Sequence, residues 1–147
     1  MSERTVLEAM SVRRVVSLPP SASARDAACL MTSANCRSVL VVEHGANSMR
    51  GIVTERDIIT RVVAKGLDPS QTVVSTVMTA DPESVGPATR VADAVLVMIE
   101  HDIHHLPVVA ANGKLLGVFS VRDALPLEVT DAYGLSEFNQ QVNDALG

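Results

Sequence analysis

The chain of 147 residues contains an internal repeat. When the sequence is slid along itself by 67 positions, residues 24–31 fall on residues 91–98 with the same apolar pattern. The offset becomes 66 at Gly51 and Gly117, because the turn at residues 44–48 is one residue longer than its counterpart. A length change confined to a turn is compatible with a duplication. We therefore predict two halves of equivalent structure.

A second shared pattern stands near the end of each half. It consists of a glycine, two apolar residues, a hydroxyl residue, one further residue and Arg-Asp, and it occurs at residues 51–57 and 117–123. This order is typical of a strand that runs directly into a helix beginning with a carboxylate. Free N–H groups at a helix start, together with small polar side chains, favour a polar ligand. The repeat thus predicts two candidate binding sites.

Apolar spacing and turn residues predict the elements that lead to each motif. Helices are expected at residues 26–34 and 93–101, with the hydroxyls of Ser23 and Thr89 as N-caps. Short apolar runs predict two strands in each half, at residues 39–43, 50–53, 106–110 and 116–119. The pair Asn112-Gly113 indicates a hairpin turn in the second half.

After the motif the two halves are expected to differ. In the first half a helix should cover residues 56–65 and end at Gly66, a favourable C-cap residue. In the second half Pro126 should cut this helix short or kink it. The tail shows helical apolar spacing at residues 136–146 behind a candidate cap at Ser136, and we interpret it as an accessory or dimer-stabilising helix.

One half alone is too small to be more than marginally stable. We therefore predict an α+β fold in which two β-α-β-β-α repeats pack sheet against sheet, with pseudo-twofold symmetry around a shared core. The predicted organisation is a first repeat, a linker, a second repeat and a C-terminal tail with an accessory helix, at residues 1–66, 67–72, 73–126 and 127–147.

Composition narrows the class of function. Apolar residues make up 47% of the chain, and Phe and Tyr number only three, so the core is expected to be aliphatic. The net charge of −5 disfavours nucleic acid and anionic membranes as partners. No apolar run is long enough to span a membrane and the first five residues hold no signal-peptide core, so we expect a cytoplasmic protein. Cys29 and Cys36 are predicted to be reduced core cysteines.

Catalysis and metal binding have little support in the sequence. No nucleophile motif and no phosphate-binding glycine loop is present, so we expect no enzyme and no catalytic cofactor. His101, His104 and His105 have the spacing of one helix face, but the helix is expected to end there, and no metal site is predicted. The simplest alternative for the motif residues is helix capping, which would explain each hydroxyl but not the repeated aspartate.

The tandem β-α-β-β-α repeat with Gly-x-x-Ser/Thr-x-x-Asp in both halves resembles a pair of CBS domains, a Bateman module. The preceding residues 106–109 and the segment 77–79 are similar to the same family. The resemblance covers residues 5–125 and implies a stand-alone pair that binds ligands of the adenosine type: AMP, ADP, ATP, S-adenosylmethionine or NAD.

The resemblance also implies which residues contact the ligand. Asp would hold the ribose hydroxyls and Ser or Thr the ribose or phosphate, giving Thr54 with Asp57 and Ser120 with Asp123. Phosphate contacts would come from the opposite repeat. The residues assigned in this way to the Asp57 site are His104, His105 and Thr79, and those assigned to the Asp123 site are Arg37, Ser38 and Ser11. Arg56 and Arg122 could add phosphate charge, whereas Leu40 stands where the family usually has proline.

From these inferences we predict a regulatory module that binds an adenine nucleotide, with AMP as the first choice, in the cleft between the repeats. It would signal by conformational change to a regulated protein that the sequence does not name. Members of this family pair through their helices, so a homodimer is expected. The alternative is a module that dimerises and binds a protein partner without any ligand.

Overall fold

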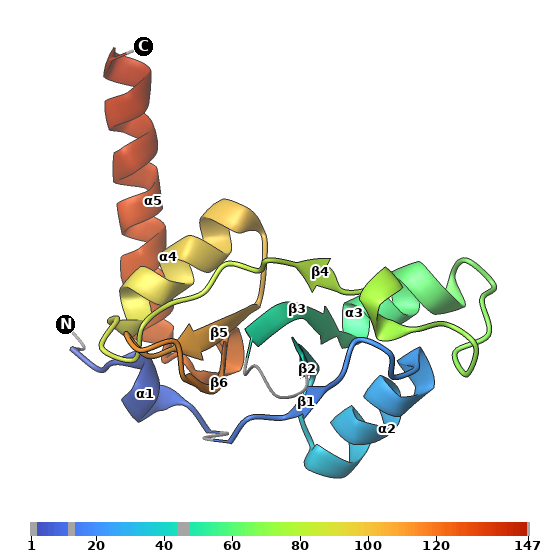
Figure 1. Ribbon diagram of the computed structural model, residues 1–147. Helices are drawn as coiled ribbons and strands as arrows, with labels where there is room; N and C mark the ends of the chain where they lie inside the picture. Colours follow the sequence, from blue (N-terminus) through green and yellow to red (C-terminus); the bar gives the residue numbers. More distant parts are fainter. Residues whose placement is uncertain (1–2, 12–13, 44–47, 147) are drawn as a thin grey trace. The chain divides into compact units, whose positions relative to one another are not determined.

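The structure, a computed structural model, describes residues 3–11, 14–43 and 48–146. It divides into two compact units, each with its own sheet and helices (Figure 1). The first unit is Arg14–Glu83, and the second unit combines Met1–Arg13 with Ser84–Gly147. The N-terminal segment therefore folds with the second repeat.

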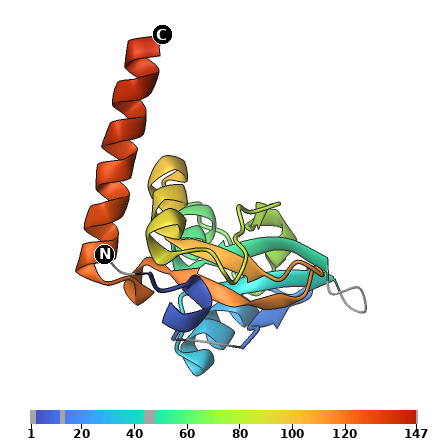
Figure 2. The ribbon, with the colours of Figure 1, turned by 90° about the vertical axis from the view of Figure 1, so that its left-hand side faces the viewer.

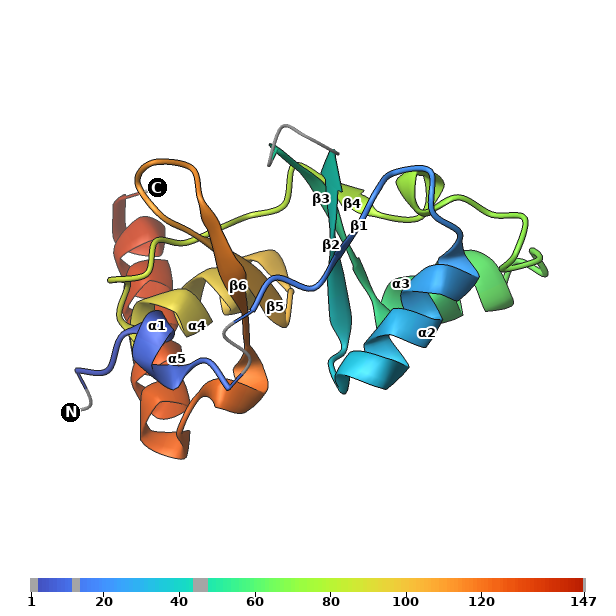
Figure 3. The same cartoon turned by 60° about the horizontal axis from the view of Figure 1, so that its bottom comes forward.

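The first unit is built on a four-stranded sheet of order β1-β2-β3-β4, in which β1 is parallel to β2 and the other pairs are antiparallel. Its elements are β1 (Ser17–Leu18), α2 (Ala24–Ala34), β2 (Ser38–Glu43), β3 (Ser48–Thr54), α3 (Glu55–Ile58), the π-helical η1 (Ile59–Val63), the 3-10 helix η2 (Val74–Thr76) and β4 (Thr79–Ala80). Helices α2 and α3 lie on the same side of this sheet (Figure 3). The strands predicted before the motif are confirmed, and residues 44–47 of the turn between them lie outside the described residues.

The second unit repeats this plan on a smaller sheet. Its elements are α1 (Val6–Ala9), α4 (Val91–His101), β5 (His105–Val109), β6 (Leu115–Ser120), the 3-10 helix η3 (Val121–Asp123) and α5 (Pro126–Leu146). Strands β5 and β6 form the predicted hairpin, with Gly113 at a φ of +86° in its turn. Val85 pairs in parallel with Val108, as Leu18 pairs with Val41 at the equivalent positions of the first unit.

Two predicted helix ends are confirmed and one is wrong. Ser23 caps α2 in a capping box with Asp26, and the helix after the first motif, whose last residue is Val63, ends in a turn that contains Gly66 at a φ of +67°. Thr89, however, does not cap α4: the helix begins at Val91, two residues before the predicted start, and Arg90 is the N-cap without a side-chain hydrogen bond. The N-terminal segment satisfies another free amide at this helix start, since the carbonyl oxygen of Arg4 accepts from the first helical amide, that of Val91, over 2.9 Å.

The helix after the second motif is cut short before Pro126, as predicted, but Pro126 itself begins a further helix that was not predicted. After the second motif only the single turn η3 forms, and Ala124 is extended before α5 starts at Pro126. Proline is tolerated in the first helical turn, where its missing N–H is not needed. Helix α5 then continues without interruption through Ser136, so Ser136 is an interior residue and not a cap.

Each unit has a buried core of its own. In the first unit, Ala27 and Met31 of α2 pack against Val39, Val41 and Val53 of the sheet. In the second unit α4 packs on β5 and β6 around Phe119, and α5 lies beside α4 (Figure 2). The packing of the two repeats around one pseudo-twofold axis stays a prediction. Cys29 is exposed, so the prediction of two core cysteines is wrong for this residue, although both cysteines are free.

Candidate functional site

The first motif lies where β3 runs into α3. Thr54 is extended and caps the helix, its hydroxyl accepting from the amide of Asp57 over 3.3 Å. The carboxylate of Asp57 reaches back, so that its Oδ2 accepts from the amide of Thr54 over 2.9 Å and from the hydroxyl over 3.1 Å. The two predicted ligand residues therefore hold each other at the helix start.

The second motif has the same arrangement at the end of β6. Oδ2 of Asp123 accepts from the amide of Ser120 over 3.1 Å, and the Ser120 hydroxyl accepts from the amide of Arg122 over 3.3 Å. Only the short η3 follows, so this site has a single turn of helix behind it.

Capping boxes of this kind occur at two further helix starts, between Thr5 and Glu8 and between Ser23 and Asp26. The expectation that capping explains the hydroxyl but not the repeated aspartate is therefore wrong, because the carboxylate is the second half of a capping box. The two motifs differ from these further capping boxes in the contacts of the second carboxylate oxygen, Oδ1 of Asp57 and Oδ1 of Asp123.

In the first unit Oδ1 of Asp57 faces a cation. Nε of Arg61, one helical turn further on, lies 3.8 Å away, and the same guanidinium donates to the carbonyl oxygens of Val77 and Met78 over 3.0 Å each. Arg61 thus ties the aspartate to the segment that precedes Thr79. The sequence analysis missed Arg61, although its position four residues after Asp57 on a predicted helix was a usable signal.

Thr79 lies on β4, which pairs with β3 so that Thr79 faces Ile52 and Ala80 faces Gly51. A Cβ at Gly51 would lie 2.6 Å from both the Met78 sulfur and the Thr79 carbonyl oxygen. The motif glycine therefore allows the segment with Thr79 to approach the strand that carries Thr54. The structure therefore brings Gly51, Thr54 and Thr79 together in the first unit.

In the second unit Oδ1 of Asp123 accepts from the hydroxyl of Ser11 over 2.7 Å and from its amide over 3.4 Å. The carbonyl oxygen of Asp123 accepts from the guanidinium of Arg4 over 3.1 Å. Arg4 also pairs with the carboxylate of Glu128, which is fully buried, at 2.7 Å. This hydrogen bond with Glu128 raises the pKa of Arg4. The structure thus brings Ser11 to the second motif.

The predicted phosphate residues lie at the starts of β2 and β5, beside the motif of their own unit. Ser38 faces Thr54 across the strand pair, and His105 faces Ser120. The carbonyl oxygens of the preceding residues, Arg37 and His104, accept over 3.1 Å from the amides that directly follow Thr54 and Ser120. Their predicted role, at the motif of the opposite repeat, joins residues of different units and stays a prediction.

Two further cations flank the aspartates. Arg56 and Arg122 are exposed, and within the described part of the chain neither guanidinium has a hydrogen bond or an ion pair. Both are therefore available to an anionic group in solvent.

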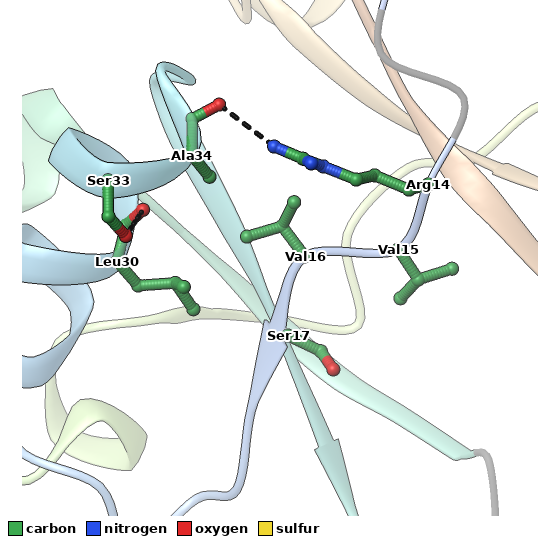
Figure 4. A pocket seen from close by; sticks show the side chains of 7 residues that line it. All are labelled: Arg14, Val15, Val16, Ser17, Leu30, Ser33 and Ala34. Carbon is green, nitrogen blue, oxygen red and sulfur yellow. Dashed lines mark hydrogen bonds between the residues drawn. The ribbon is translucent and has the colours of Figure 1, made fainter.

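Two surface pockets lie apart from the motif carboxylates. One, of about 400 Å³, is lined by the segment Arg14–Ser17 and the end of α2, where Arg14 donates to the Ala34 carbonyl oxygen over 3.2 Å (Figure 4). The other, of about 180 Å³, lies between α4 and α5 in the second unit, and His104 is the one predicted site residue that lines it. Neither pocket contains Asp57 or Asp123.

Within residues 3–11, 14–43 and 48–146, no three His, Cys, Asp or Glu side chains gather as metal ligands would. None of the helices in this part of the chain has the length and apolar character needed to cross a bilayer.

Comparison with known proteins points to one family. The sequence model of the CBS domain matches residues 6–64 and 74–128. The CBS domain-containing protein YhcV of Bacillus subtilis is 36% identical over 110 residues, which are 75% of this chain and 76% of YhcV. Some curated relatives are longer, and the chain spans 59% of one and 22% of another.

Solved structures give the same result. A protein with CBS domains from Burkholderia ambifaria is 33% identical, with a TM-score of 0.73 over 80% of this chain and 86% of that one. CBS domain protein PAE2072 from Pyrobaculum aerophilum, solved as a complex with AMP, is 27% identical, with a TM-score of 0.78 over 89% of this chain and 99% of that one. Because both repeats match and the fold agrees, this chain belongs to the CBS-domain family and is a tandem CBS pair.

Proposed function

We propose that this chain is a regulatory module that binds an adenine nucleotide at one or both strand-to-helix motifs. The observation that carries the proposal is that the two oxygens of each motif carboxylate make different contacts. Oδ2 completes the capping box, whereas Oδ1 takes no part in it. An ionised carboxylate is a strong acceptor, and an oxygen left over from capping can accept from a ribose hydroxyl.

The two sites differ in what a ligand would have to displace. At Asp57, Oδ1 lies 3.8 Å from Nε of Arg61, which is beyond hydrogen-bond distance. At Asp123 the same oxygen already accepts from Ser11 over 2.7 Å. We expect the Asp57 site to bind first and more tightly, because no hydrogen bond has to be broken there.

AMP is the first choice of ligand, and the AMP complex of the Pyrobaculum relative supports it. ADP, ATP, NAD and S-adenosylmethionine share the adenosine group that the motif would hold, and they are the alternatives. His104 and His105 are proposed to contact the phosphate of a nucleotide at Asp57, and Arg37 and Ser38 that of a nucleotide at Asp123. The exposed guanidinium groups of Arg56 and Arg122 would add positive charge at each site.

CBS domains are in general regulatory and not catalytic, and this agrees with a role in signalling. In the proposed mechanism the nucleotide stabilises one arrangement of the two repeats, and a partner protein binds that arrangement preferentially. A cytoplasmic location and a homodimer belong to the same proposal, and the repeat helices are one candidate for the surface through which two copies pair.

A second candidate function is dimerisation and partner binding without a ligand. It is favoured by the apolar surface after the first motif, where Ile59 and Val63 are 60% and 63% exposed. Side chains of this kind often form protein interfaces.

Thermal unfolding in the presence of each nucleotide distinguishes the two candidates. A ligand present at 100 times its dissociation constant should stabilise the fold by about 2.7 kcal/mol, which raises the melting temperature by several degrees. If no nucleotide changes the melting temperature while the protein stays dimeric, the ligand-independent function is supported instead.

A further inference from the structure

Helix α5 is longer than the unit that supports it. Its first half is anchored, since Glu128 and Ala132 are fully buried against the second unit. Every residue from Glu137 to Leu146 is exposed. Within the second unit this half of the helix extends beyond α4, β5 and β6 (Figures 1 and 2).

The extending half carries an apolar stripe. Leu135, Phe138, Val142 and Leu146 are 39%, 61%, 39% and 82% exposed. Their spacing of three, four and four residues places them on one face of a helix. Such a stripe normally faces a partner.

The sequence of this half would not hold a helix by itself. Isolated helices of about a dozen residues are marginal in water even when rich in alanine. This segment also contains Gly134, Ser136, Asn139 and Asn143, which are weaker helix formers. Packing against a partner would provide the missing stability.

The charges around the stripe indicate a second copy of this chain as that partner. Asn139 and Gln141, which flank the stripe, are neutral. Glu137 and Asp144 lie on the opposite side of the helix at 100° per residue. Asp131 lies on the same face one turn before Leu135, so two identical stripes avoid bringing like charges together when they pair antiparallel, and the stripe itself offers no charge that would select a charged partner instead.

The size of the stripe is sufficient for a specific pair. At the exposed fractions given above, the four side chains present roughly 400 Å² of apolar surface per copy, or about 800 Å² in a pair. At the usual apolar share of an interface, this corresponds to about 1,200–1,400 Å² in total. That value lies at the lower end of stable protein interfaces.

We propose that the second half of α5 pairs with the same segment of a second copy, and that Phe138 lies at the centre of this contact. This interface is separate from the nucleotide sites and from the exposed apolar side chains of Ile59 and Val63. It is formed by residues that have no counterpart in the first repeat.

Sedimentation velocity of the full chain over a series of concentrations tests this proposal. The wild type should dimerise, and Phe138→Asp should raise the dissociation constant by about tenfold or more, since a central aromatic residue is a typical hot spot. Gln140→Asp is the matched control, because it adds the same charge to an exposed position on the other side of the helix and should change the constant less than about twofold.

Circular dichroism checks that both variants remain folded, and Phe138→Ser serves as the second variant if Phe138→Asp does not. A monomeric wild type at the highest concentration would overturn the proposal. Equal dissociation constants for all three proteins would overturn it too, and would point to the side chains of Ile59 and Val63 as the interface. The outcome is independent of nucleotide binding, which is measured separately on the same proteins.

Discussion

The hydroxyl of Ser11 donates a hydrogen bond to Oδ1 of Asp123 over 2.7 Å. The two residues are 112 positions apart in the sequence, and the contact fixes the N-terminal segment at the second motif. The Ser11 hydroxyl thus donates to the same carboxylate oxygen that would accept a hydrogen bond from a ribose hydroxyl. Ser11 was predicted to contact the ligand, but in this position we expect it to compete with the proposed ligand at the Asp123 site.

Replacing Ser11 should strengthen nucleotide binding at Asp123. In Ser11→Ala the ligand no longer displaces a hydrogen bond to a charged acceptor, a bond that contributes about 1.5–3 kcal/mol. Since the Ser11 amide still donates over 3.4 Å, we expect part of this, a gain in affinity of about three- to tenfold. Calorimetry with AMP in an Asp57→Asn background isolates the site. Weaker binding would mean instead that the Ser11 hydroxyl contacts the ligand.

Arg4 should matter more for stability than its place near the chain end indicates. In Arg4→Ala the buried carboxylate of Glu128 loses its ion pair with the guanidinium, while the amide of Leu125 still donates to it over 2.8 Å. Removing one partner of an ion pair with a buried carboxylate is costly, and we expect the melting temperature to fall by about 10 °C. Arg90→Ala breaks a surface pair with Asp93 and should lower it by no more than about 3 °C. Equal shifts in both variants would show that burial of Glu128 does not depend on Arg4.

The same substitution should have opposite effects at two glycines. Gly51→Ala places a Cβ 2.6 Å from the Thr79 carbonyl oxygen, so β4 must shift, at a cost of about 1–3 kcal/mol in the free energy of unfolding. Gly134→Ala, within α5, meets no atom within 4 Å and should stabilise the protein by up to about 1 kcal/mol. Urea unfolding measures both. A neutral Gly51→Ala would contradict the close approach of β3 and β4.

Asp26 should contribute to the acid sensitivity of the fold. Hydrogen bonds from the amide and hydroxyl of Ser23 lower the pKa of Asp26. Its ionised form therefore stabilises the protein above the unfolded-state pKa of about 3.9, and this contribution is lost as the pH falls through the lower, folded-state value. Melting temperatures of the wild type and of Asp26→Asn should converge as the pH falls below about 4. A constant difference across this range would argue against the assigned cause.

Local patterns in the sequence were sufficient for much of this structure. The duplication, the strands before each motif, the Ser23 cap and the end at Gly66 all follow from spacing, hydroxyl residues and glycine. These signals lie within a few residues of the feature that they predict. The resemblance to CBS domains added the placement of Ser11 beside Asp123, which no local pattern contains.

The features that the sequence did not predict depend on distant partners. Thr89 is not a cap because the carbonyl oxygen of Arg4 accepts from the first amide of α4. A glutamate is normally expected on the surface, yet Glu128 is buried, and Arg4, 124 positions away, pairs with it. In both cases a contact from another part of the chain accompanies the unexpected feature. The long helix that begins at Pro126 was not predicted for a different reason, since proline can either end a helix or occupy its first turn.

Calorimetric titration of AMP tests the central claim most directly. The wild type should bind AMP with a dissociation constant below 1 mM, a value at which binding supplies about 4.1 kcal/mol. Asp57→Asn with Asp123→Asn removes the charges but keeps an oxygen for each capping box, and should weaken binding at least about tenfold. Asp26→Asn, a change in a capping box outside the motifs, should leave the affinity unchanged. Wild-type affinity in the double variant, or no binding of any adenine nucleotide below the millimolar range, would contradict the account.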